Sequence, residues 1–277
     1  MIKLGKVNRL QIVKFVDFGL YLDGGDGVEI LLPRRYVTEE MKEGDDIDVF
    51  VYADSEDRLV ATTETPKAQV GDFAFLQVAA VNNVGAFMDW GLMKDLLVPF
   101  REQKVRMEKG RYYVVYIYVD DNSKRIVASA KLDKFLDNKI PEYNPNDEVE
   151  IMVTKKTDLG YKVIVDKLFG GMIYHNEIFK DINIGEVHKA YVKNIRDDQK
   201  IDLILSSNKG KDRVNIVADE ILDYLKNNNG FMKFNDASSP EEIKAQFECS
   251  KKDFKKSIGL LFKKGIITIT DDGVKLN

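Results

Sequence analysis

Over most of this chain, hydrophobic and polar residues alternate with a period of two. Near the N-terminus, for example, Leu10 and Ile12 alternate with Arg9 and Gln11, a pattern typical of a β-strand. Segments dense in β-branched and aromatic residues repeat this pattern further along the chain. They predict strands at residues 47–52, 73–81, 113–119, 149–154, 190–195 and 201–205.

Glycines mark an internal repeat within this strand-rich region. Three copies share a spacing of fourteen and then twenty-five residues: Gly5, Gly19 and Gly44; Gly71, Gly85 and Gly110; and Asn146, Gly160 and Gly185. The third copy has Asn146 in the leading position, where the other copies have glycine. A repeat of this length indicates that one structural unit is used three times.

Each copy supplies about five short strands in roughly sixty residues. Turn-forming residues separate the strands and predict hairpin turns at Gly24–Gly27, Asp120–Asn122, Gly170–Gly171 and Asp197–Gln199. A small, partly open, five-stranded Greek-key barrel of the OB type fits this length and strand count, and such barrels commonly bind single-stranded nucleic acid on one face. A glycine at the start of the second strand suits a bend at the barrel corner.

From residue 210 onward, hydrophobic residues recur at helical spacing. A first helix is predicted to stop at Asn227–Gly230, a second begins with Ser239 as N-cap, and a third runs from Ser250 to Gly265. The last residues, 266–276, read as a hairpin around Asp271-Asp272-Gly273. Three helices followed by a hairpin form the winged-helix arrangement, which resembles the helix-turn-helix class.

The expected fold class is therefore mainly β with a C-terminal α+β domain. We predict three tandem five-stranded OB-type barrels followed by a winged-helix domain. The expected ranges are 1–66, 67–143 and 144–208 for the barrels and 209–277 for the winged helix.

Charge is distributed unevenly among these segments. The whole chain has a net charge of −4, which by itself argues against a strongly basic nucleic-acid binder. Residues 1–66 hold 8 Lys+Arg and 14 Asp+Glu (−6), residues 67–143 hold 12 and 10 (+2), residues 144–208 hold 9 and 11 (−2), and residues 209–277 hold 13 and 11 (+2). The first copy is the acidic one.

Several classes of function lack their signatures in this sequence. No segment approaches the roughly 20 apolar residues of a membrane span, and the N-terminus has no signal-peptide pattern, so we expect a cytoplasmic protein with no membrane partner. Cys249 is the single cysteine, and His175 and His188 are the two histidines. We therefore expect no disulfide, no metal and no cofactor.

Motifs for catalysis are also missing. The sequence has no nucleophile elbow, no phosphate-binding glycine loop and no zinc-protease motif. Its many carboxylates lie in runs typical of solvated surface, such as Glu39-Glu40. We expect no catalytic residues, no enzymatic activity and no small-molecule substrate, with a nuclease as the one enzymatic alternative.

The first copy carries a more specific motif. The segment Val16–Asp23, with Phe18, Gly19 and Tyr21, resembles the second strand of S1-type RNA-binding domains. The resemblance implies that Phe18 and Tyr21 face RNA. It extends to Asp54 and Arg58, which take the family's acidic and basic positions, whereas the family's third-strand histidine is replaced by Pro33. Arg34, the next residue, joins this predicted RNA face.

The second copy keeps part of the same pattern. Phe87 takes the place of the second aromatic residue, while the residue before Gly85 is not aromatic. Asp121 and Arg125 match the family's acidic and basic positions. The resemblance therefore implies an RNA face that contains Phe87, Asp121 and Arg125.

The third copy departs from the pattern in a different way. Tyr161 follows the glycine, and Lys162 stands where the second aromatic residue is expected. His175 restores the family's histidine, Lys200 takes the basic position, and Arg196 stands in the acidic one. The resemblance implies RNA contacts by Tyr161, Lys162, His175 and Lys200.

Together with the winged helix, these three S1-type copies resemble the conserved virulence factor B family of bacterial S1-like RNA-binding proteins over nearly the whole chain. The resemblance implies binding to single-stranded RNA and post-transcriptional control of gene expression. Tandem repetition supports binding, because several weak contacts on one chain raise the overall affinity by about 10²–10⁴ when geometry permits.

Two other functions stay open on this sequence. One is a DNA-binding regulator that acts through the winged helix, and the other is a ribosome- or protein-docking scaffold. Four lysines of the third helix, Lys251, Lys252, Lys255 and Lys256, are candidate contacts to nucleic acid, although lysine-rich helical faces are usually just solvated. Aromatic residues in strands often pack in a core or against a neighbouring strand, and we expect such a structural role for Trp90, Phe100, Tyr112 and Tyr116.

Overall fold

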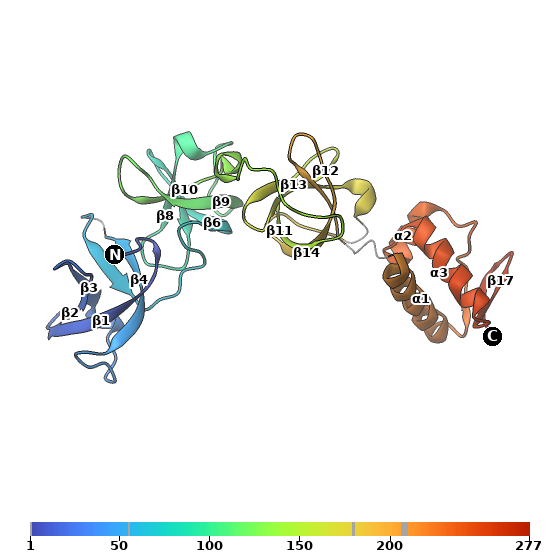
Figure 1. Cartoon of the computed structure of the whole chain (residues 1–277), viewed down its shortest axis with the longest axis horizontal. Coiled ribbons are helices and arrows are strands. Elements are labelled where there is room, and N and C mark those ends of the chain that lie inside the picture. Colours follow the sequence, from blue (N-terminus) through green and yellow to red (C-terminus); the bar gives the residue numbers. More distant parts are fainter. Residues whose placement is uncertain (1, 55, 179–180, 206–209) are drawn as a thin grey trace. The chain divides into compact units, whose positions relative to one another are not determined.

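We describe a computed structural model of the chain, which covers residues 2–54, 56–178, 181–205 and 210–277. The chain divides into two compact units, Met1–Leu136 and Asp137–Asn277, called unit 1 and unit 2 below. Unit 1 contains two barrels, and unit 2 contains a third barrel and a helical domain (Figure 1). The predicted ranges for four domains stay a prediction, and their boundary at 208/209 lies outside the described residues.

Each of the three barrels has five strands in the same order. Barrel 1 consists of β1 (Lys6–Val16), β2 (Gly19–Asp23), β3 (Glu29–Pro33), β4 (Asp46–Ala53) and β5 (Leu59–Thr62). Barrel 2 consists of β6 (Phe73–Val81), β7 (Gly85–Asp89), β8 (Leu96–Pro99), β9 (Tyr112–Val119) and β10 (Ile126–Ser129). Barrel 3 consists of β11 (Glu148–Lys156), β12 (Gly160–Val165), β13 (Phe169–Tyr174), β14 (Val187–Ile195) and β15 (Ile201–Ile204).

All three barrels are closed, which differs from the partly open barrel expected from the sequence. In barrel 1, the long strand β1 pairs antiparallel with β2 through its second half and with β4 through its first half. The parallel pair of β3 with β5 then completes the circle. Closure removes the sheet edges that would otherwise be open to pairing with other chains. The predicted fold class, three OB-type barrels before a winged helix, is confirmed.

The repeated glycines have two separate structural causes. Gly5 and Gly71 have positive φ of 72° and 93°, and Asn146 in the third copy has φ of 73°. Asparagine is one of the few residues that tolerate this left-handed conformation, which explains the substitution. At Gly19 the cause is close approach, because a Cβ atom there would lie 2.1 Å from the carbonyl oxygen of Leu32.

One predicted hairpin turn is wrong. Gly170–Gly171 lies inside strand β13, and the turn before it is formed by Asp166 and Lys167, both of which have positive φ (46° and 59°). Gly171 is required for packing, since a Cβ atom there would lie 2.7 Å from Cδ1 of Leu203 in β15. The other three predicted turns lie between strands, as expected.

Barrels 1 and 2 share a hydrophobic contact within unit 1. Phe50 and Tyr52, both on β4 of barrel 1, belong to the same buried cluster as Trp90 of barrel 2. The rings of Phe50 and Trp90 meet edge to face with their centroids 5.6 Å apart. Trp90 is buried, as predicted, and its indole N–H donates to the carbonyl oxygen of Lys94.

Four short 3₁₀ helices follow strands of the barrels: η1 (Arg34–Tyr36), η2 (Phe100–Glu102), η3 (Leu132–Phe135) and η4 (His175–Glu177). Three of them, η1, η2 and η4, begin directly after the third strand of a barrel. Their first residues, Arg34, Phe100 and His175, therefore occupy equivalent positions in the three barrels.

The helical domain has the predicted winged-helix elements. Its helices are α1 (Gly210–Asn227), α2 (Pro240–Phe247) and α3 (Lys251–Lys263), and its strands are β16 (Phe231–Met232), β17 (Ile267–Thr270) and β18 (Gly273–Leu276). Ser239 and Ser250 cap α2 and α3 as expected, each by accepting a backbone N–H. Strand β16, which the hydrophobic pattern did not predict, pairs with β18. Cys249 is buried in this domain.

Within the part of the chain that the structure describes, no helix has both the length and the hydrophobicity to cross a membrane.

Candidate nucleic-acid interface

Barrel 1 presents two aromatic rings beside a lysine. Phe18, in the turn before β2, is 56% exposed, and Tyr21 lies half-buried on β2. Their rings meet edge to face with centroids 6.3 Å apart. On the neighbouring strand, the Lys14 Nζ lies 5.0 Å from the centre of the Tyr21 ring and also pairs with Glu29. The two aromatic residues predicted from the sequence therefore form one surface together with a cation.

The β4–β5 turn of barrel 1 positions Arg58. The carboxylate of Asp54 accepts the backbone N–H groups of Glu56 and Arg58 and two hydrogen bonds from the Arg58 guanidinium, at 2.9 and 2.7 Å. Burial opposes ionisation of this carboxyl, but the hydrogen bonds from Arg58 outweigh it and lower the pKa of Asp54. Asp54 thus acts on the predicted face by orienting Arg58, whose side chain stays 68% exposed.

The residue that follows the third strand is equivalent in all three barrels. The backbone N–H of Arg34 donates to the carbonyl oxygen of Phe18, and the N–H of His175 donates in the same way to Leu159. Arg34, rather than Pro33, therefore occupies the position of the family's histidine in barrel 1. In barrel 2 this position holds Phe100, which is half-buried under the guanidinium of Arg106.

The acidic position of barrel 2 is occupied by Asp120 and not by Asp121. The N–H of Asp120 donates to the carbonyl oxygen of Arg125, just as that of Asp54 donates to Arg58 in barrel 1. This turn is one residue longer than its counterpart, so sequence spacing placed the carboxylate one position too late. Asp120 accepts from Ser123 and Arg101, and hydrogen bonds from Ser123 lower its pKa. Asp121 is exposed in the turn.

Arg125, the basic residue of barrel 2, reaches across to barrel 1. Its Nε and Nη2 atoms donate to the two carboxylate oxygens of Asp57, at 2.8 and 2.6 Å. Such bidentate pairs are among the stronger charge-assisted hydrogen bonds, and this one lowers the pKa of Asp57. Phe87, on strand β7, is half-buried. The predicted face of barrel 2 therefore lies next to barrel 1.

In barrel 3, the aromatic residue and the lysine after the glycine point to opposite sides of the strand. Lys162 is exposed and occupies the position of Tyr21, since it pairs with Lys155 of β11 as Tyr21 pairs with Lys14 of β1. Tyr161 is half-buried and packs against the barrel core. The structure therefore does not bring Tyr161 to the place of the aromatic residues in barrels 1 and 2.

The remaining candidates of barrel 3 are exposed. His175 lies 5.9 Å from the Tyr161 ring, centroid to centroid, and its Nε2 is 3.0 Å from the carbonyl oxygen of Thr157. Lys200 pairs with Asp198 of the same turn at 2.8 Å. Arg196 and Lys200 form the turn in the way Asp54 and Arg58 do in barrel 1, so barrel 3 has a cation in place of the carboxylate.

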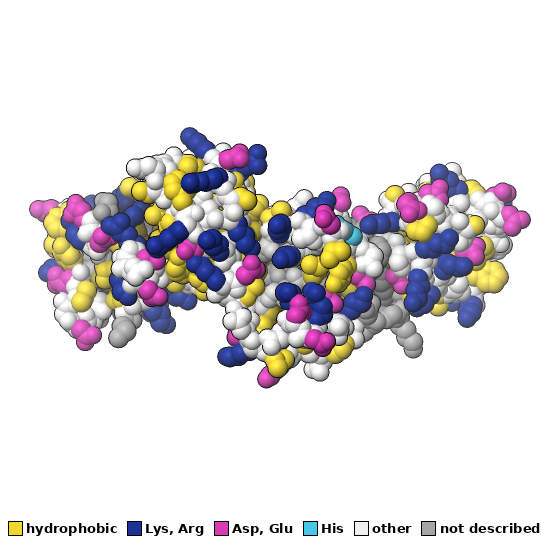
Figure 2. Space-filling view, turned by 90° about the horizontal axis from the view of Figure 1, so that it is seen from above, with side chains coloured by type: hydrophobic (Ala, Val, Ile, Leu, Met, Phe, Trp, Pro, Cys, Tyr) yellow, Lys and Arg dark blue, Asp and Glu magenta, His cyan; other side chains and the backbone are white. Residues whose placement is uncertain are grey.

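Three of the four candidate lysines in the winged helix, Lys252, Lys255 and Lys256, lie exposed on α3, and Lys251 is partly buried. Lys255 pairs with Asp236 at 3.3 Å. Phe262, further along the same helix, is 52% exposed. Figure 2 shows Lys and Arg side chains beside exposed hydrophobic side chains in both units.

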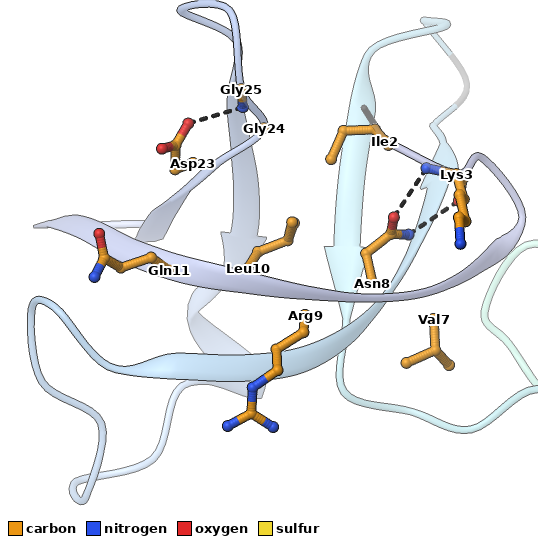
Figure 3. Close-up of a pocket in the computed structure, with 10 residues that line it drawn as sticks. All are labelled: Ile2, Lys3, Val7, Asn8, Arg9, Leu10, Gln11, Asp23, Gly24 and Gly25. Atoms are coloured by element: carbon orange, nitrogen blue, oxygen red, sulfur yellow. Dashed lines mark hydrogen bonds between the residues drawn. The ribbon is translucent and has the colours of Figure 1, made fainter.

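A groove on barrel 1 has a different character. It lies between the first half of β1 and the β2–β3 turn (Figure 3). Its polar groups already serve local structure: the Asn8 amide binds the backbone of Lys3, and the Asp23 carboxylate accepts the N–H of Gly25. Arg9 points away from Leu10 on the other side of the strand (Figure 3). This groove therefore does not assemble a set of groups that converge on a ligand.

Comparison with known proteins agrees with the architecture. A family model described as S1 domain matches residues 4–64, and one described as CvfB-like winged helix domain matches residues 219–276. The chain is 29% identical to the uncharacterized protein YitL of Bacillus subtilis over 94% of this chain and 89% of that one. It is 25% identical to conserved virulence factor B of Staphylococcus aureus (strain USA300), over 99% of this chain and 94% of the relative. The resemblance to the conserved virulence factor B family is confirmed.

A solved structure of a multidomain protein with nucleic acid binding domains from Streptococcus pneumoniae is similar as well. It is 27% identical, and the alignment covers 99% of this chain and 98% of that one with a TM-score of 0.43. The matched S1 and winged-helix domains support nucleic-acid binding, and neither is an enzymatic family. Among the residues with a described position, no group of three or more His, Cys, Asp or Glu is placed to hold a metal ion.

Proposed function

We propose that this chain is a non-enzymatic cytoplasmic protein that binds single-stranded RNA on its S1-type barrels and thereby controls gene expression after transcription. The observation that carries this proposal is the surface of barrel 1 on which Phe18 and Tyr21 lie beside Lys14. Arg58 is held by Asp54 in the turn that connects β4 to β5. Every base has an aromatic face, so rings at such a surface stack on single-stranded RNA of any sequence.

The free energy of base stacking on exposed rings is large enough to support RNA binding by this surface. Stacking of a base on an aromatic side chain contributes about 1–3 kcal/mol. A surface with two rings therefore gives only modest affinity, but three barrels on one chain raise it through their effective concentration. Cations beside the rings add attraction to phosphates, which weakens as salt increases.

Removal of the exposed ring of Phe18 tests the proposal. Phe18→Ala in the full chain should lower affinity for a labelled single-stranded RNA by about tenfold, because about 1–3 kcal/mol of stacking is lost. Since the ring is 56% exposed, thermal unfolding should change little. Fluorescence anisotropy at two salt concentrations measures the affinity.

Phe231→Ala is the matched control, since Phe231 is also a partly exposed phenylalanine but lies on β16, outside both the barrels and α3. It should leave RNA binding unchanged. If instead Phe262→Ala on α3 weakens binding to duplex DNA and Phe18→Ala changes nothing, the chain is a DNA-binding regulator that acts through the winged helix. Absence of binding to both nucleic acids would favour a protein-docking scaffold.

A further inference from the structure

A cavity of about 370 Å³ lies between barrels 1 and 2 within unit 1. Barrel 1 contributes Tyr52 and Ala53 to its wall, and barrel 2 contributes Phe87, Lys94, Asp95 and Arg125. Val84 and Leu97 add further hydrophobic surface. Its volume falls within the range of small-molecule sites, about 300–1,000 Å³, and its mix of apolar walls with a few polar groups is typical of them.

The two walls of the cavity are fixed to one another. The Nζ of Lys94 donates to the carbonyl oxygens of Ala53 and Asp54 of barrel 1, at 2.9 and 2.8 Å. The bidentate pair of Arg125 with Asp57 joins the same two barrels. Together with the buried contact between Phe50 and Trp90, these bonds form a site that needs little ordering when a ligand binds.

Two cations in the wall retain donors for an anion. An ammonium group has three N–H donors, and two carbonyl oxygens accept from Lys94. A guanidinium has five, and Asp57 accepts from the Nε and Nη2 of Arg125. Burial, followed by the charge of Arg125, lowers the pKa of Lys94. A phosphate group would relieve this unfavourable proximity of two positive charges.

Asp95 gives the cavity a hydrogen-bond acceptor. Within the described part of the chain, its carboxylate makes no hydrogen bond or ion pair. Burial and then the charge of Asp89 raise the pKa of Asp95. A partly buried carboxylate in this state is stabilised by a ligand that donates a hydrogen bond to it. Exocyclic amino groups of nucleobases are such donors, and Asp and Glu accept from them in nucleic-acid complexes.

We propose that this cavity binds one unstacked nucleotide of single-stranded RNA whose base carries an exocyclic amino group. The base lies against Phe87, the amino group donates to Asp95, and the phosphate contacts Arg125 and Lys94. Phe87 and Arg125 belong to the predicted RNA face of barrel 2, whereas Asp95 and the wall from barrel 1 form a two-barrel site that a single S1 domain lacks. This inference rests on the proposed RNA binding and adds base selectivity to it.

Selectivity between bases tests the inference separately from RNA binding itself. The full chain should bind a short oligocytidine or oligoadenosine more tightly than an oligouridine by about tenfold, the value of one hydrogen bond to a charged group. Asp95→Asn should reduce this preference to near equality, because an amide can donate to a uracil carbonyl as well as accept from an amino group.

A second variant fills the cavity from an exposed position. Val84 is 51% exposed, so Val84→Trp should not disturb the core, and its indole should occupy the place of the base. It should weaken binding to oligocytidine about tenfold, by loss of one stacked base. Unchanged thermal unfolding would show that both variants are folded.

The outcomes separate the two proposals. If wild-type protein binds none of the oligonucleotides, the proposed RNA binding fails and the two-barrel site fails with it. If all three bind equally and Phe18→Ala weakens them while Asp95→Asn and Val84→Trp change nothing, RNA binding stands and the two-barrel site is overturned.

Discussion

At the scale of single residues, the glycines show most directly how backbone geometry restricts this sequence. Gly19, Gly85 and Gly160 each begin the second strand of a barrel, and a Cβ atom at any of them would lie 2.0–2.3 Å from a carbonyl oxygen of the third strand. No side-chain rearrangement relieves such a contact, because the obstructing atom belongs to the backbone. In barrel 1, Gly19 lies between Phe18 and Tyr21 in the sequence, so a backbone shift at this glycine would displace both rings of the candidate surface.

Gly19→Ala should therefore destabilise barrel 1 and weaken RNA binding as well. Overpacking of this kind costs about 1–3 kcal/mol, which should lower the midpoint of the first thermal transition by several degrees. Gly44→Ala is the control, since Gly44 has φ of 90° but no atom within 4 Å of the added Cβ. It should cost only the left-handed backbone, about 1–2 kcal/mol, and leave RNA affinity intact. Equal RNA affinities for the two variants would contradict this view of Gly19.

At the scale of elements, short hydrogen-bonded turns decide which side chains join a face. The strands were predictable because burial on one side imposes a period of two, as at Leu10 and Ile12 of β1. The helix starts were predictable because Ser239 forms a local capping box. The length of the turns was not predictable, because the extra residue between Asp120 and Arg125 does not change the hydrophobic pattern. For this reason the acidic position of barrel 2 was misplaced by one residue.

Contacts between residues far apart in the chain could not be predicted from the sequence either. Asp57 and Arg125 lie 68 positions apart, and nothing in either turn indicates that the carboxylate of one barrel binds the guanidinium of the next. Both residues fit a solvated turn equally well. The cavity beside them depends on this packing of the two barrels, so the sequence did not indicate Asp95 as a candidate site residue.

The loop before β14 contains a carboxylate, Glu186, whose ionisation should make the stability of barrel 3 depend on pH. Hydrogen bonds from Asn183 and then from His188 lower the pKa of Glu186 from 4.5 to about 2. Because the folded-state pKa is the lower one, the stabilisation is present above pH 4.5 and is lost as the pH falls toward about 2. The thermal midpoint of barrel 3 should fall over this range in the wild-type protein and less steeply in Glu186→Gln. Glu150→Gln, an exposed glutamate of β11, is the control for loss of one carboxylate charge, and an identical profile for both variants would contradict the role of Glu186.

At the scale of the whole molecule, each of the three barrel faces is incomplete as a nucleic-acid surface in the part of the chain that the structure describes. Barrel 1 has the most complete aromatic surface but lies in the acidic segment of the chain, barrel 2 shares its cations with barrel 1, and barrel 3 has a lysine where the others have a ring. Incomplete sites on one chain bind well only when several engage the same RNA. The winged helix would raise the overall RNA affinity if its exposed lysines contact the same RNA.

A triple substitution on α3, Lys252→Gln with Lys255→Gln and Lys256→Gln, tests this addition in the full chain. Each phosphate contact on a single strand contributes about 0.7 to the slope of log affinity against log salt. If all three lysines contact RNA, the slope should fall by about 2, and affinity at low salt should fall with it. Anisotropy titrations over a range of salt concentrations measure both quantities.

A matched control removes three exposed lysines elsewhere in the winged-helix domain, Lys226, Lys233 and Lys244. Because it changes the net charge by the same amount, it separates specific contacts from general attraction. Equal slopes for the two triple variants would mean that α3 does not touch the RNA. If, in that case, only the α3 variant lost binding to duplex DNA, the winged helix would serve a second nucleic acid while the barrels bind the first. The difference between the two triple variants therefore assigns the partner of the winged helix without any need to separate it from the chain.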